Sequence, residues 1–377
     1  MKYLSDLKKQ ELNGKRVLLR VDFDVPILNG KIVEDFRIKS SKESLDYLIN
    51  YGAKVLLIGH LGHDTSNASF GPIVEGLGEI LGYTLTLVPH SELPNIDVLF
   101  AAGQTLLLDN IRQDPREIKN DEGLAVSLSK GFDYFINDAF AVTHRNHASV
   151  VAITKCLPSY AGFLIKKETE NFKQAMESPV EGKILVFGGA KISTKLPVIK
   201  NFLDKAEKIL IGGALANNFF KVRGIDVGAS VVDDDFLLNI ESEKIILPED
   251  LLISDDKSGQ SGGEIQQVKN IDPGHLILDI GPETAKHYTE IIKAAKIVIW
   301  NGPMGLSEID AFAGGTRKIA EATASASKSI IGGGDTIAAV DKIDLLGRYS
   351  FVSTGGGAML EFLAGNKLPG LEVLVYY

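Results

Sequence analysis

Five short glycine-rich segments each follow an apolar run in the second half of the chain. The apolar runs have the composition of buried strands, and most of the glycine segments lead into a helix-like sequence. The paired segments are residues 183–187 with 188–191, 208–211 with 212–214, 297–300 with 301–305, 329–331 with 332–335, and 351–352 with 353–357. A bare backbone at a helix N-terminus presents unpaired N–H groups and the positive end of the helix dipole. Several such turns at one sheet edge predict a ligand that carries several phosphates.

Charged side chains follow the apolar runs of the first half in the same way. They are Asp22, Asp24, His60, Arg112, Asp138, His144, Arg145 and His147. In open parallel sheets, ligands bind beyond the carboxyl ends of the strands. The net charge is −9, so a protein that binds polyanions must gather its cations locally. The sequence therefore predicts two domains. In one, cationic side chains gather at the carboxyl edge of the sheet, and in the other, glycine turns do.

The elements that position these residues alternate between strand and helix. In the first half we expect helices at 40–51 and 73–81, and strands at 16–22, 54–59, 84–88, 98–100, 105–109 and 134–137. The strands are nearly continuous in Val, Ile and Leu, as strands covered on both faces are. Such alternation predicts an α/β fold with a parallel sheet in each half. A charged helix at 166–176 should connect the two, and residues 255–263 should form a solvated loop.

Composition limits the class of protein. A chain of 377 residues with 45% hydrophobic and 24% charged residues suits a globular protein of two domains. No apolar run is long enough to cross a membrane, and no signal peptide is evident, so we expect a cytoplasmic protein. The single cysteine, Cys156, excludes an internal disulfide, and the acidic charge argues against nucleic-acid binding.

Several common motifs are missing, and purely structural explanations remain for the residues singled out above. There is no P-loop motif and no protein-kinase catalytic loop. There is also no G-x-G-x-x-G after a strand, which argues against a nicotinamide dehydrogenase. The spacings His60-x-x-His63 and His144-x-x-His147 could suit zinc, but both lie in loops without a thiolate. Taken alone, each glycine turn could be tight packing, Asp335 an N-cap, and Arg37 part of a surface ion pair.

The ordered set of motifs resembles the phosphoglycerate kinase family from about residue 17 to 374. The matching segments are Arg20-Val-Asp-Phe-Asp-Val-Pro26, Gly59-His-Leu-Gly62, Asn137-Asp-Ala-Phe140 with His144-Arg145-x-His147, Gly188-Gly-Ala-Lys-Ile-Ser193, Trp300-Asn-Gly-Pro-Met-Gly305, Gly332-Gly-Gly-Asp-Thr336 and Ser353-Thr-Gly-Gly-Gly-Ala358. The resemblance implies two Rossmann-like domains, each a parallel sheet flanked by helices, joined by a hinge helix. The implied boundaries are 1–165 for the acid-substrate domain, 166–178 for the hinge, 179–365 for the nucleotide domain and 366–377 for a tail that returns to the first domain.

The family's reaction would be reversible phosphoryl transfer between 1,3-bisphosphoglycerate and ADP, giving 3-phosphoglycerate and ATP, with Mg²⁺. The catalytic residues implied are Arg37, Lys191, Gly334 and Gly357. The acid would be bound by Asp22, Phe23, Asp24, Arg37, His60, Leu61, Gly62, His63, Arg112 and Arg145. The nucleotide would be bound by Gly189, Ala190, Lys191, Lys195, Gly213, Ala214, Ile277, Asn301, Glu308, Gly332, Gly333, Gly334, Asp335 and Thr336, with Asp335 holding the metal. A monomer that closes at its hinge is the implied working form.

Four positions depart from the family pattern. Asp24 stands where the family usually has Asn, and His63 where it has Arg, a change that could weaken phosphate binding by roughly 1–3 kcal/mol unless Arg116 or a lysine compensates. Ile277 and Ala214 replace glycines near the base, which would narrow the adenine pocket or alter base preference. The rival hypothesis is a nucleotide-binding relative whose acid site has been weakened or lost.

Overall fold

The computed structural model describes residues 1–62, 67–103, 105–233 and 240–375. The chain divides into two compact units. Unit 1 comprises Met1–Glu170 and Lys367–Tyr377, and unit 2 comprises Asn171–Asn366. The boundary lies within α7 (Phe163–Glu177), the helix expected at 166–176. Each unit contains its own six-stranded parallel sheet, so the predicted α/β class is confirmed.

The sheet of unit 1 has the strand order β5-β6-β4-β1-β7-β8. Its strands are β1 (Arg16–Arg20), β4 (Lys54–Ile58), β5 (Thr86–Val88), β6 (Thr105–Leu108), β7 (Tyr134–Asn137) and β8 (Ser159–Ala161). All neighbouring strands are parallel, and Arg20 pairs in register with both Ile58 and Asn137. The residues that follow β1, β4, β6 and β7 therefore emerge at one edge. A short hairpin, β2 (Ile27–Leu28) with β3 (Lys31–Ile32), lies outside this sheet.

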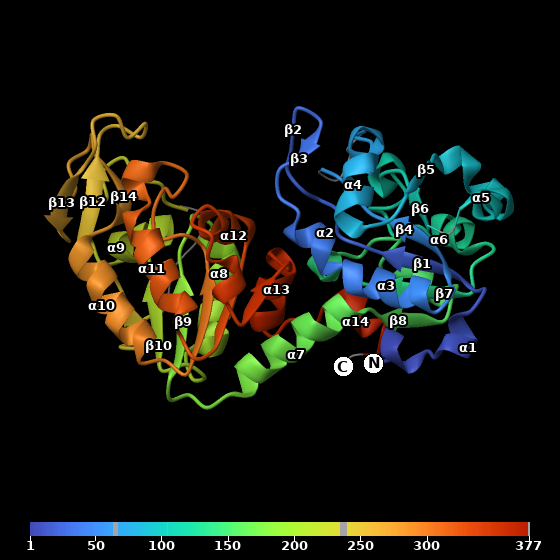
Figure 1. Cartoon of the computed structure of the whole chain (residues 1–377). Helices are drawn as coiled ribbons and strands as arrows, with labels where there is room; N and C mark the ends of the chain where they lie inside the picture. The colour runs from blue at the N-terminus through green and yellow to red at the C-terminus, as the bar shows by residue number, and fades with distance from the viewer. Residues whose placement is uncertain (63–66, 104, 234–239, 376–377) are drawn as a thin grey trace. The chain divides into compact units, whose positions relative to one another are not determined.

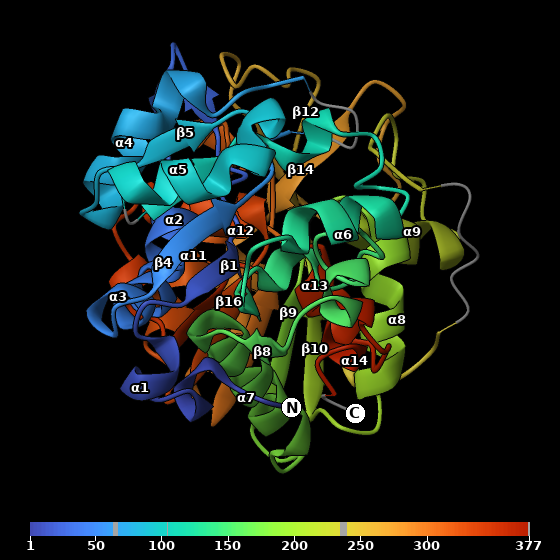
Figure 2. The ribbon, with the colours of Figure 1, turned by 90° about the vertical axis from the view of Figure 1, so that its right-hand side faces the viewer.

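Both faces of this sheet are buried, which explains the continuous apolar strands. Val17 and Leu19 of β1 belong to one core cluster and Leu18 to another. The first cluster includes residues of α2 (Phe36–Ser40), α3 (Lys42–Asn50) and α4 (Val74–Leu81), and α3 packs next to β4 (Figure 2). The second includes residues of α5 (Ile96–Ala102) and α6 (Glu122–Ser129). The remaining α-helices of unit 1 are α1 (Lys9–Leu12) and α14 (Pro369–Glu372).

The sheet of unit 2 has the order β11-β10-β9-β15-β16-β17. Its strands are β9 (Lys183–Phe187), β10 (Lys208–Ile211), β11 (Ile245–Ile246), β15 (Ile297–Asn301), β16 (Ser329–Gly332) and β17 (Phe351–Ser353). Asn301 pairs in register with Phe187 on one side and with Gly332 on the other. Because the strands are parallel, the five glycine turns meet at one edge, as the sequence predicts.

Helices also flank this second sheet. They are α8 (Ile192–Phe202), α9 (Gly213–Val222), α10 (Pro282–Lys293), α11 (Gly314–Ala324), α12 (Gly334–Asp341) and α13 (Gly357–Leu363). Residues of α10, α11 and α12 share one core cluster with Trp300 and Ile331, and α10 and α11 lie side by side (Figure 1). A second, antiparallel sheet in this unit was not expected from the sequence. Its order is β13-β12-β14, with β12 (Asp250–Ser254), β13 (Glu264–Gln267) and β14 (Leu276–Ile280).

Several short segments are 3-10 helices. They are Leu4–Asp6, Gly71–Ile73, His90–Asn95, Ile111–Gln113, Phe140–Val142, Ala152–Lys155, Asp310–Phe312 and Leu346–Arg348. The turns that carry Arg112 and precede His144 are among them. No described helix is both long and apolar enough to span a lipid bilayer.

One expected element of unit 1 is corrected by the structure, and another is found with slightly narrower bounds. Residues 98–100 are not a strand but the middle of α5, in which Ile96 and Phe100, one turn apart, are buried while Val98 is 71% exposed. A run of three apolar residues cannot by itself distinguish a strand from one helical face. The helix expected at 40–51 is α3, preceded by the separate short helix α2.

Candidate functional site

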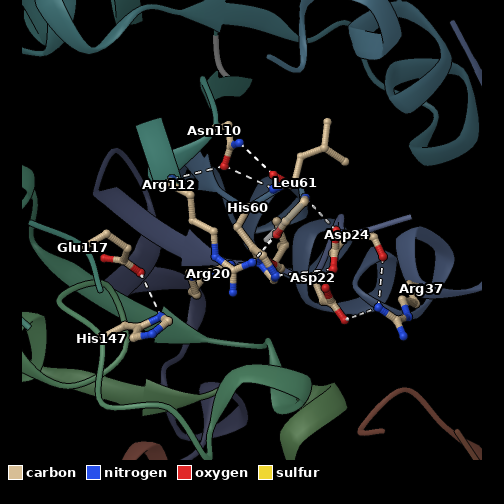
Figure 3. Close-up of polar contacts among 12 residues, drawn as sticks. Arg20, Asp22, Asp24, Arg37, His60, Leu61, Asn110, Arg112, Glu117 and His147 are labelled. Atoms are coloured by element: carbon tan, nitrogen blue, oxygen red, sulfur yellow. Dashed lines mark hydrogen bonds and ion pairs between the residues drawn. The ribbon is translucent and has the colours of Figure 1, made fainter. Parts of the chain in front are cut away.

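The edge of unit 1 gathers the side chains that follow β1 with Arg37 of α2. Asp22 is fully buried, and its Oδ2 lies 3.7 Å from Nη1 of Arg37. The same Nη1 donates to the backbone carbonyl of Asp24 at 2.9 Å (Figure 3). Burial raises the pKa of Asp22, and the charge of Arg37 opposes that shift. The ion pair with Asp22 holds Arg37 at the sheet edge, so Arg37 is not merely part of a surface ion pair.

Asp24, which departs from the family pattern, is held by the turn after β4. Its Oδ1 accepts a hydrogen bond from the backbone N–H of Gly62 at 2.9 Å. Its Oδ2 lies 3.6 Å from Nε2 of His60. A backbone N–H that donates to a carboxylate offsets part of the repulsion between that carboxylate and a nearby anionic ligand. Two features of this chain therefore accommodate the acidic residue.

His60 and Arg20 form the interior of this edge. Arg20, at the end of β1, is 1% exposed, and its Nη2 lies 3.3 Å from Nδ1 of His60. Its Nη1 also donates to the carbonyl oxygen of Val21 at 2.5 Å. Burial first, and then the neighbouring Arg20 and Arg112 charges, place the pKa of His60 well below its ordinary value. His60 is therefore a neutral imidazole.

Arg20 is anchored on its other side by a buried acid, which sequence analysis did not select. Its Nε donates to Oγ of Ser149 at 3.0 Å, and Ser149 Oγ donates to Oε1 of Glu117 at 2.6 Å. Nδ1 of His147 lies 3.8 Å from the same Oε1 (Figure 3). Burial raises the pKa of Glu117, and Arg20 opposes the shift. Glu117 lies in a charged and polar segment, residues 112–122, so nothing in the sequence distinguishes it from a solvent-exposed acid.

Asn110 organises the turns that carry Leu61 and Arg112. Its side chain accepts from the N–H of Leu61 and of Arg112, both at 3.1 Å, and donates to the Leu61 carbonyl at 2.8 Å. Arg112 donates through Nη1 to the carbonyl of Gly62. These bonds bring Arg112 and Leu61 to the same edge as His60 (Figure 3). Asn110 is a further positioning residue that sequence analysis missed.

The other expected acid-binding residues are placed differently. The side chain of Phe23 is fully buried, with its ring 6.3 Å from that of Phe70, so only its backbone could contact a ligand. Arg145 is exposed and follows the Phe140–Val142 turn. His63 lies outside the described residues. The guanidinium group of Arg116, which could have compensated for His63, instead binds the carboxylate of Asp114, with Nη2 donating to Oδ2 at 2.7 Å.

In unit 2, three of the glycine turns are closed against one another by backbone hydrogen bonds. The N–H of Gly189 donates to the Pro303 carbonyl and that of Gly213 to the Met304 carbonyl, each at 2.8 Å. The N–H of Gly188 donates to the Asn301 carbonyl at 3.1 Å. The expectation that these particular N–H groups are free for an anion is wrong, because the turns use them to hold one another.

Close backbone approach explains the glycines of these turns. Gly302 has φ +95°, and a Cβ there would lie 2.3 Å from the carbonyl oxygen of Gly188. Gly213 has φ +59°, and its Cβ would lie 2.6 Å from the nitrogen of Gly189. Any side chain would separate the turns. The packing alternative therefore accounts for these positions.

The two remaining turns open directly into helices. Gly334 and Gly357 are exposed and are the first residues of α12 and α13, whose first N–H groups have no acceptor within the helix. Gly333 precedes Gly334 with φ +98°. Asn301 donates to the Gly332 carbonyl at 2.8 Å, and Thr336 Oγ1 accepts from the Gly302 N–H at 2.7 Å. Asn301 and Thr336 thus brace the turn, and the glycines present the donors.

Two lysines and one aspartate lie near these turns. Lys191 is the exposed N-cap of α8, and Lys195, one turn later, is 7% exposed. Burial lowers the pKa of Lys195 to about 8, opposed by the charge of Asp335. A Cβ on Gly189 would lie 3.4 Å from Nζ of Lys195. The ammonium group therefore lies beside the Gly188–Gly189 turn, inside the unit, where a phosphate would be strongly stabilised.

A cavity of about 220 Å³ lies beside the same turns. The expected nucleotide-binding residues that line it are Gly189, Ala190, Gly213, Ala214, Ile277, Glu308 and Asp335. The lining is largely apolar, with Leu251, Leu276 and Met304 among its members. An apolar slot with few polar groups is typical of a site for a flat organic ring. Asn217 and Lys257 also line it and were not selected from the sequence.

The residues present fit a magnesium–phosphate complex. Asp335 brings one exposed carboxylate to the cavity at the first turn of α12, and no cluster of three potential metal ligands exists among the described residues. Mg²⁺ typically binds through one or two carboxylates and substrate phosphates, so a lone carboxylate beside open N–H groups suits it.

These features define a two-unit α/β protein, with arginines gathered at a sheet edge of one unit and a largely apolar cavity beside the glycine turns of the other. The family model described as phosphoglycerate kinase matches residues 6–366. The chain is 40% identical to the phosphoglycerate kinase of Moorella thermoacetica over 385 residues, covering 98% of each, and 42% identical to that of Roseiflexus sp. over 383 residues, covering 96% of each.

Solved structures give the same result. The phosphoglycerate kinase structure from Pyrococcus horikoshii matches with a TM-score of 0.86 and 32% identity, covering 100% of this chain and 98% of that one. The structure from Coxiella burnetii matches with a TM-score of 0.82 and 33% identity, covering 99% and 98%. The chain belongs to the phosphoglycerate kinase family.

Proposed function

We propose that this protein is a phosphoglycerate kinase, which transfers a phosphoryl group reversibly between 1,3-bisphosphoglycerate and ADP. The observation that carries the proposal is the cationic edge of unit 1, where Arg20, Arg37 and Arg112 converge around the neutral His60. In a protein of net charge −9, guanidinium groups gathered at one sheet edge favour an anionic ligand there. Family membership supplies the identity of that ligand.

The acid substrate binds at this edge. Arg37, positioned by Asp22, contacts the carboxyl end of the acid and the phosphoryl group in transit. His60 donates from Nε2 and orients the acid. Arg112 and Arg145 grip the distal phosphate, because planar guanidinium groups suit two-point binding of phosphate oxygens. The backbone at Phe23, Leu61 and Gly62 completes this pocket.

The nucleotide binds in the cavity of unit 2. Its base lies between Ala214 and Ile277, its ribose donates to Glu308, and its phosphates meet Lys195 and the N–H groups of α12. Mg²⁺, when bound through Asp335 and the phosphates, offsets their negative charge. Lys191 follows the transferring group, and the N-termini at Gly334 and Gly357 donate to its oxygens.

Catalysis needs alignment and charge stabilisation more than covalent chemistry by the protein. The acyl phosphate already has a good leaving group, so the ATP-forming direction requires no strong base. Fixed donors act most strongly where charge spreads over the moving phosphoryl group in a dry site. Direct transfer requires the two bound substrates to meet, so we also propose that the protein closes at its hinge during each turnover. We further propose that it works as a monomer in the cytoplasm.

A coupled assay of ATP-dependent bisphosphoglycerate formation from 3-phosphoglycerate tests the proposal. We expect Mg²⁺-dependent turnover that requires both substrates. Nucleotide binding without turnover would instead support the rival hypothesis of a lost acid site.

A substitution then tests the role of Lys191. Because this exposed N-cap lysine is assigned to the transferring group, Lys191→Ala should reduce kcat by about 100-fold while changing the nucleotide KM by less than about threefold. If kcat fell and the nucleotide KM rose by similar factors, a role of Lys191 confined to the transition state would be contradicted.

A further inference from the structure

Glu117 is a buried acid that holds the segment carrying Arg145. Its side chain is fully buried, although it lies in a charged stretch of the sequence. Its Oε2 accepts from the N–H of Ser149 at 2.9 Å, and its Oε1 accepts from the Ser149 hydroxyl at 2.6 Å. Its backbone carbonyl accepts from the N–H of Ala148 at 2.9 Å. These hydrogen bonds join Glu117 to the chain just after Arg145, which is assigned to the distal phosphate.

Asn120, in the same turn as Glu117, holds this segment at two further points. It has a φ of 52°, a left-handed conformation that asparagine adopts more readily than most residues. Its Oδ1 accepts from the N–H of Ala152 at 3.0 Å, and its Nδ2 donates to Oδ1 of Asn146 at 3.0 Å. Asn146 is the exposed neighbour of Arg145. The backbone that follows Arg145 is thus tied to one turn of the chain, whereas Arg145 itself is exposed.

The carboxylate of Glu117 is also linked to His60, by way of Ser149 and Arg20 (Figure 3). Both carboxylate oxygens act as acceptors, so the Ser149 hydroxyl donates its proton to Oε1, and its oxygen accepts from Nε of Arg20 at 3.0 Å. Nη2 of Arg20 in turn lies 3.3 Å from Nδ1 of His60. Glu117, Ser149 and Arg20 are each at most 1% exposed, so water does not compete for these bonds. The direction of each donor between Glu117 and His60 is therefore determined.

We propose that Glu117 and Asn120 are positioning residues of the acid site: Glu117 orients His60, and the two together hold the segment of Arg145. Because Glu117 is fully buried, it acts on the acid only through other residues. A donor and a cation that are held in place before binding reduce the ordering cost of taking up the substrate. The role should therefore appear in the affinity for 3-phosphoglycerate more than in kcat. The inference rests on the proposed function, which assigns His60 and Arg145 to this substrate.

Ser149→Ala tests the link to His60. The variant lacks the hydroxyl between Glu117 and Arg20 but keeps the N–H that donates to Oε2. We expect the ring nitrogens of His60, observed by NMR, to change from a single Nε2–H tautomer to a mixture of the two tautomers. The KM for 3-phosphoglycerate, and its Kd by calorimetry, should rise by about three- to tenfold, with kcat and the nucleotide KM within about twofold of the unmodified protein.

Asn146→Ala tests the link to the segment of Arg145. It removes the acceptor for Nδ2 of Asn120, and its exposed position should allow the variant to fold normally. The KM and the Kd for 3-phosphoglycerate should rise by about two- to fivefold. The nitrogen signals of His60 should stay unchanged, because the contacts of Arg20 are not altered.

Two matched controls accompany these variants. Ser329→Ala removes a buried hydroxyl of unit 2 that accepts from the Ser350 N–H at 3.2 Å. Asn95→Ala removes an exposed amide of unit 1 that donates to Glu92 at 2.7 Å. Both controls should leave the affinity for 3-phosphoglycerate and the His60 signals unchanged. Glu117→Gln replaces one acceptor by a donor and should show both expected effects, and if it does not fold, the variants above decide the question.

The possible results separate this inference from the proposed function. The positioning role would be overturned by unchanged His60 signals in Ser149→Ala, by unchanged affinity for 3-phosphoglycerate in either variant, or by equal losses in the matched controls. The His60 signals and the Kd require no turnover. If both change as expected but the protein transfers no phosphoryl group, the positioning role stands and the proposed function fails. If the protein turns over both substrates and the variants match it, the proposed function stands and the positioning role fails.

Discussion

Nη2 of Arg20 lies 3.3 Å from Nδ1 of His60, and this contact determines the tautomer of the imidazole. A guanidinium group only donates, so Nδ1 must accept and the proton must reside on Nε2. Nε2 in turn lies 3.6 Å from Oδ2 of Asp24. Arg20 is itself held by Ser149 and Glu117. The sheet edge therefore presents a neutral N–H donor of defined direction among several guanidinium groups.

The first prediction concerns the titration of His60. Because burial and then the Arg20 charge hold its pKa well below the ordinary value, His60 should remain neutral from about pH 6 to pH 8. The ring nitrogens, observed by NMR and assigned by loss of the signal in His60→Gln, should show protonated Nε2 and unprotonated Nδ1. A resonance that titrates near the ordinary histidine pKa would contradict the Arg20 contact.

The second prediction concerns Asp24→Asn. The asparagine Oδ1 can still accept from the Gly62 N–H, so the turn should keep its structure while one negative charge is removed. We expect the KM for 3-phosphoglycerate to fall by about two- to fivefold, with an unchanged melting temperature. The increase in affinity should shrink in high salt. An unchanged or higher KM would show that the Gly62 and His60 contacts already compensate for the carboxylate.

The third prediction concerns pH and Lys195. Burial lowers the pKa of this lysine to about 8, so its ammonium group is lost as the pH rises through that value. The kcat/KM for nucleotide should therefore fall above about pH 8, since this parameter reports the free enzyme. Lys195→Arg keeps its charge in that range and should move the decline to higher pH. Coincident pH profiles for the two proteins would assign the decline to another group.

The fourth prediction concerns stability and Asp138. This carboxyl is fully buried at the N-terminus of α7, where its Oδ1 accepts from the Leu164 N–H at 2.8 Å. Burial raises its pKa to about 8. The folded state therefore binds more protons than the unfolded state between the two pKa values. This contribution to stability is present at low pH and is lost as the pH rises toward about 8.

Asp138→Asn removes that titration while keeping the acceptor for Leu164. The free energy of unfolding, measured in urea from about pH 5 to about pH 8, should decline more steeply for the natural chain than for the variant. Parallel declines in the two proteins would show that Asp138 does not carry the shift.

Much of the fold follows from local sequence. Continuous apolar strands alternating with helical segments predict parallel sheets, and the observed division of β1 between two core clusters gives the reason. The strand-end position of Asp22, His60 and Arg112 places them at one edge once the sheet is parallel. The misassigned residues 98–100 show the limit, because burial of one helical face and burial of a strand give the same short apolar run.

The antiparallel sheet and its contribution to the cavity lay beyond sequence analysis. Residues 255–263 are polar and rich in glycine, which predicts a solvated loop, and every residue of the loop is exposed or half-buried. The sequence did not show that Lys257 of this loop also lines the cavity or that Gly259 packs against Ile309. Similarly, nothing in the sequence joins Glu117 to Ser149 and Arg20, which are far apart along the chain. Such contacts depend on how distant segments pack.

Residue type and order were enough to predict the α/β class, the family and the sheet edge where a ligand is expected, because they encode strand ends and turns directly. Only the tertiary structure decided what each group in those turns does. It showed that the N–H groups of Gly189 and Gly213 donate to carbonyl oxygens of a neighbouring turn. It also showed that Gly334 and Gly357 begin helices and that Arg20 orients His60. The physical reason is that a donor's availability depends on the acceptor that lies opposite it, and that acceptor comes from a remote part of the chain.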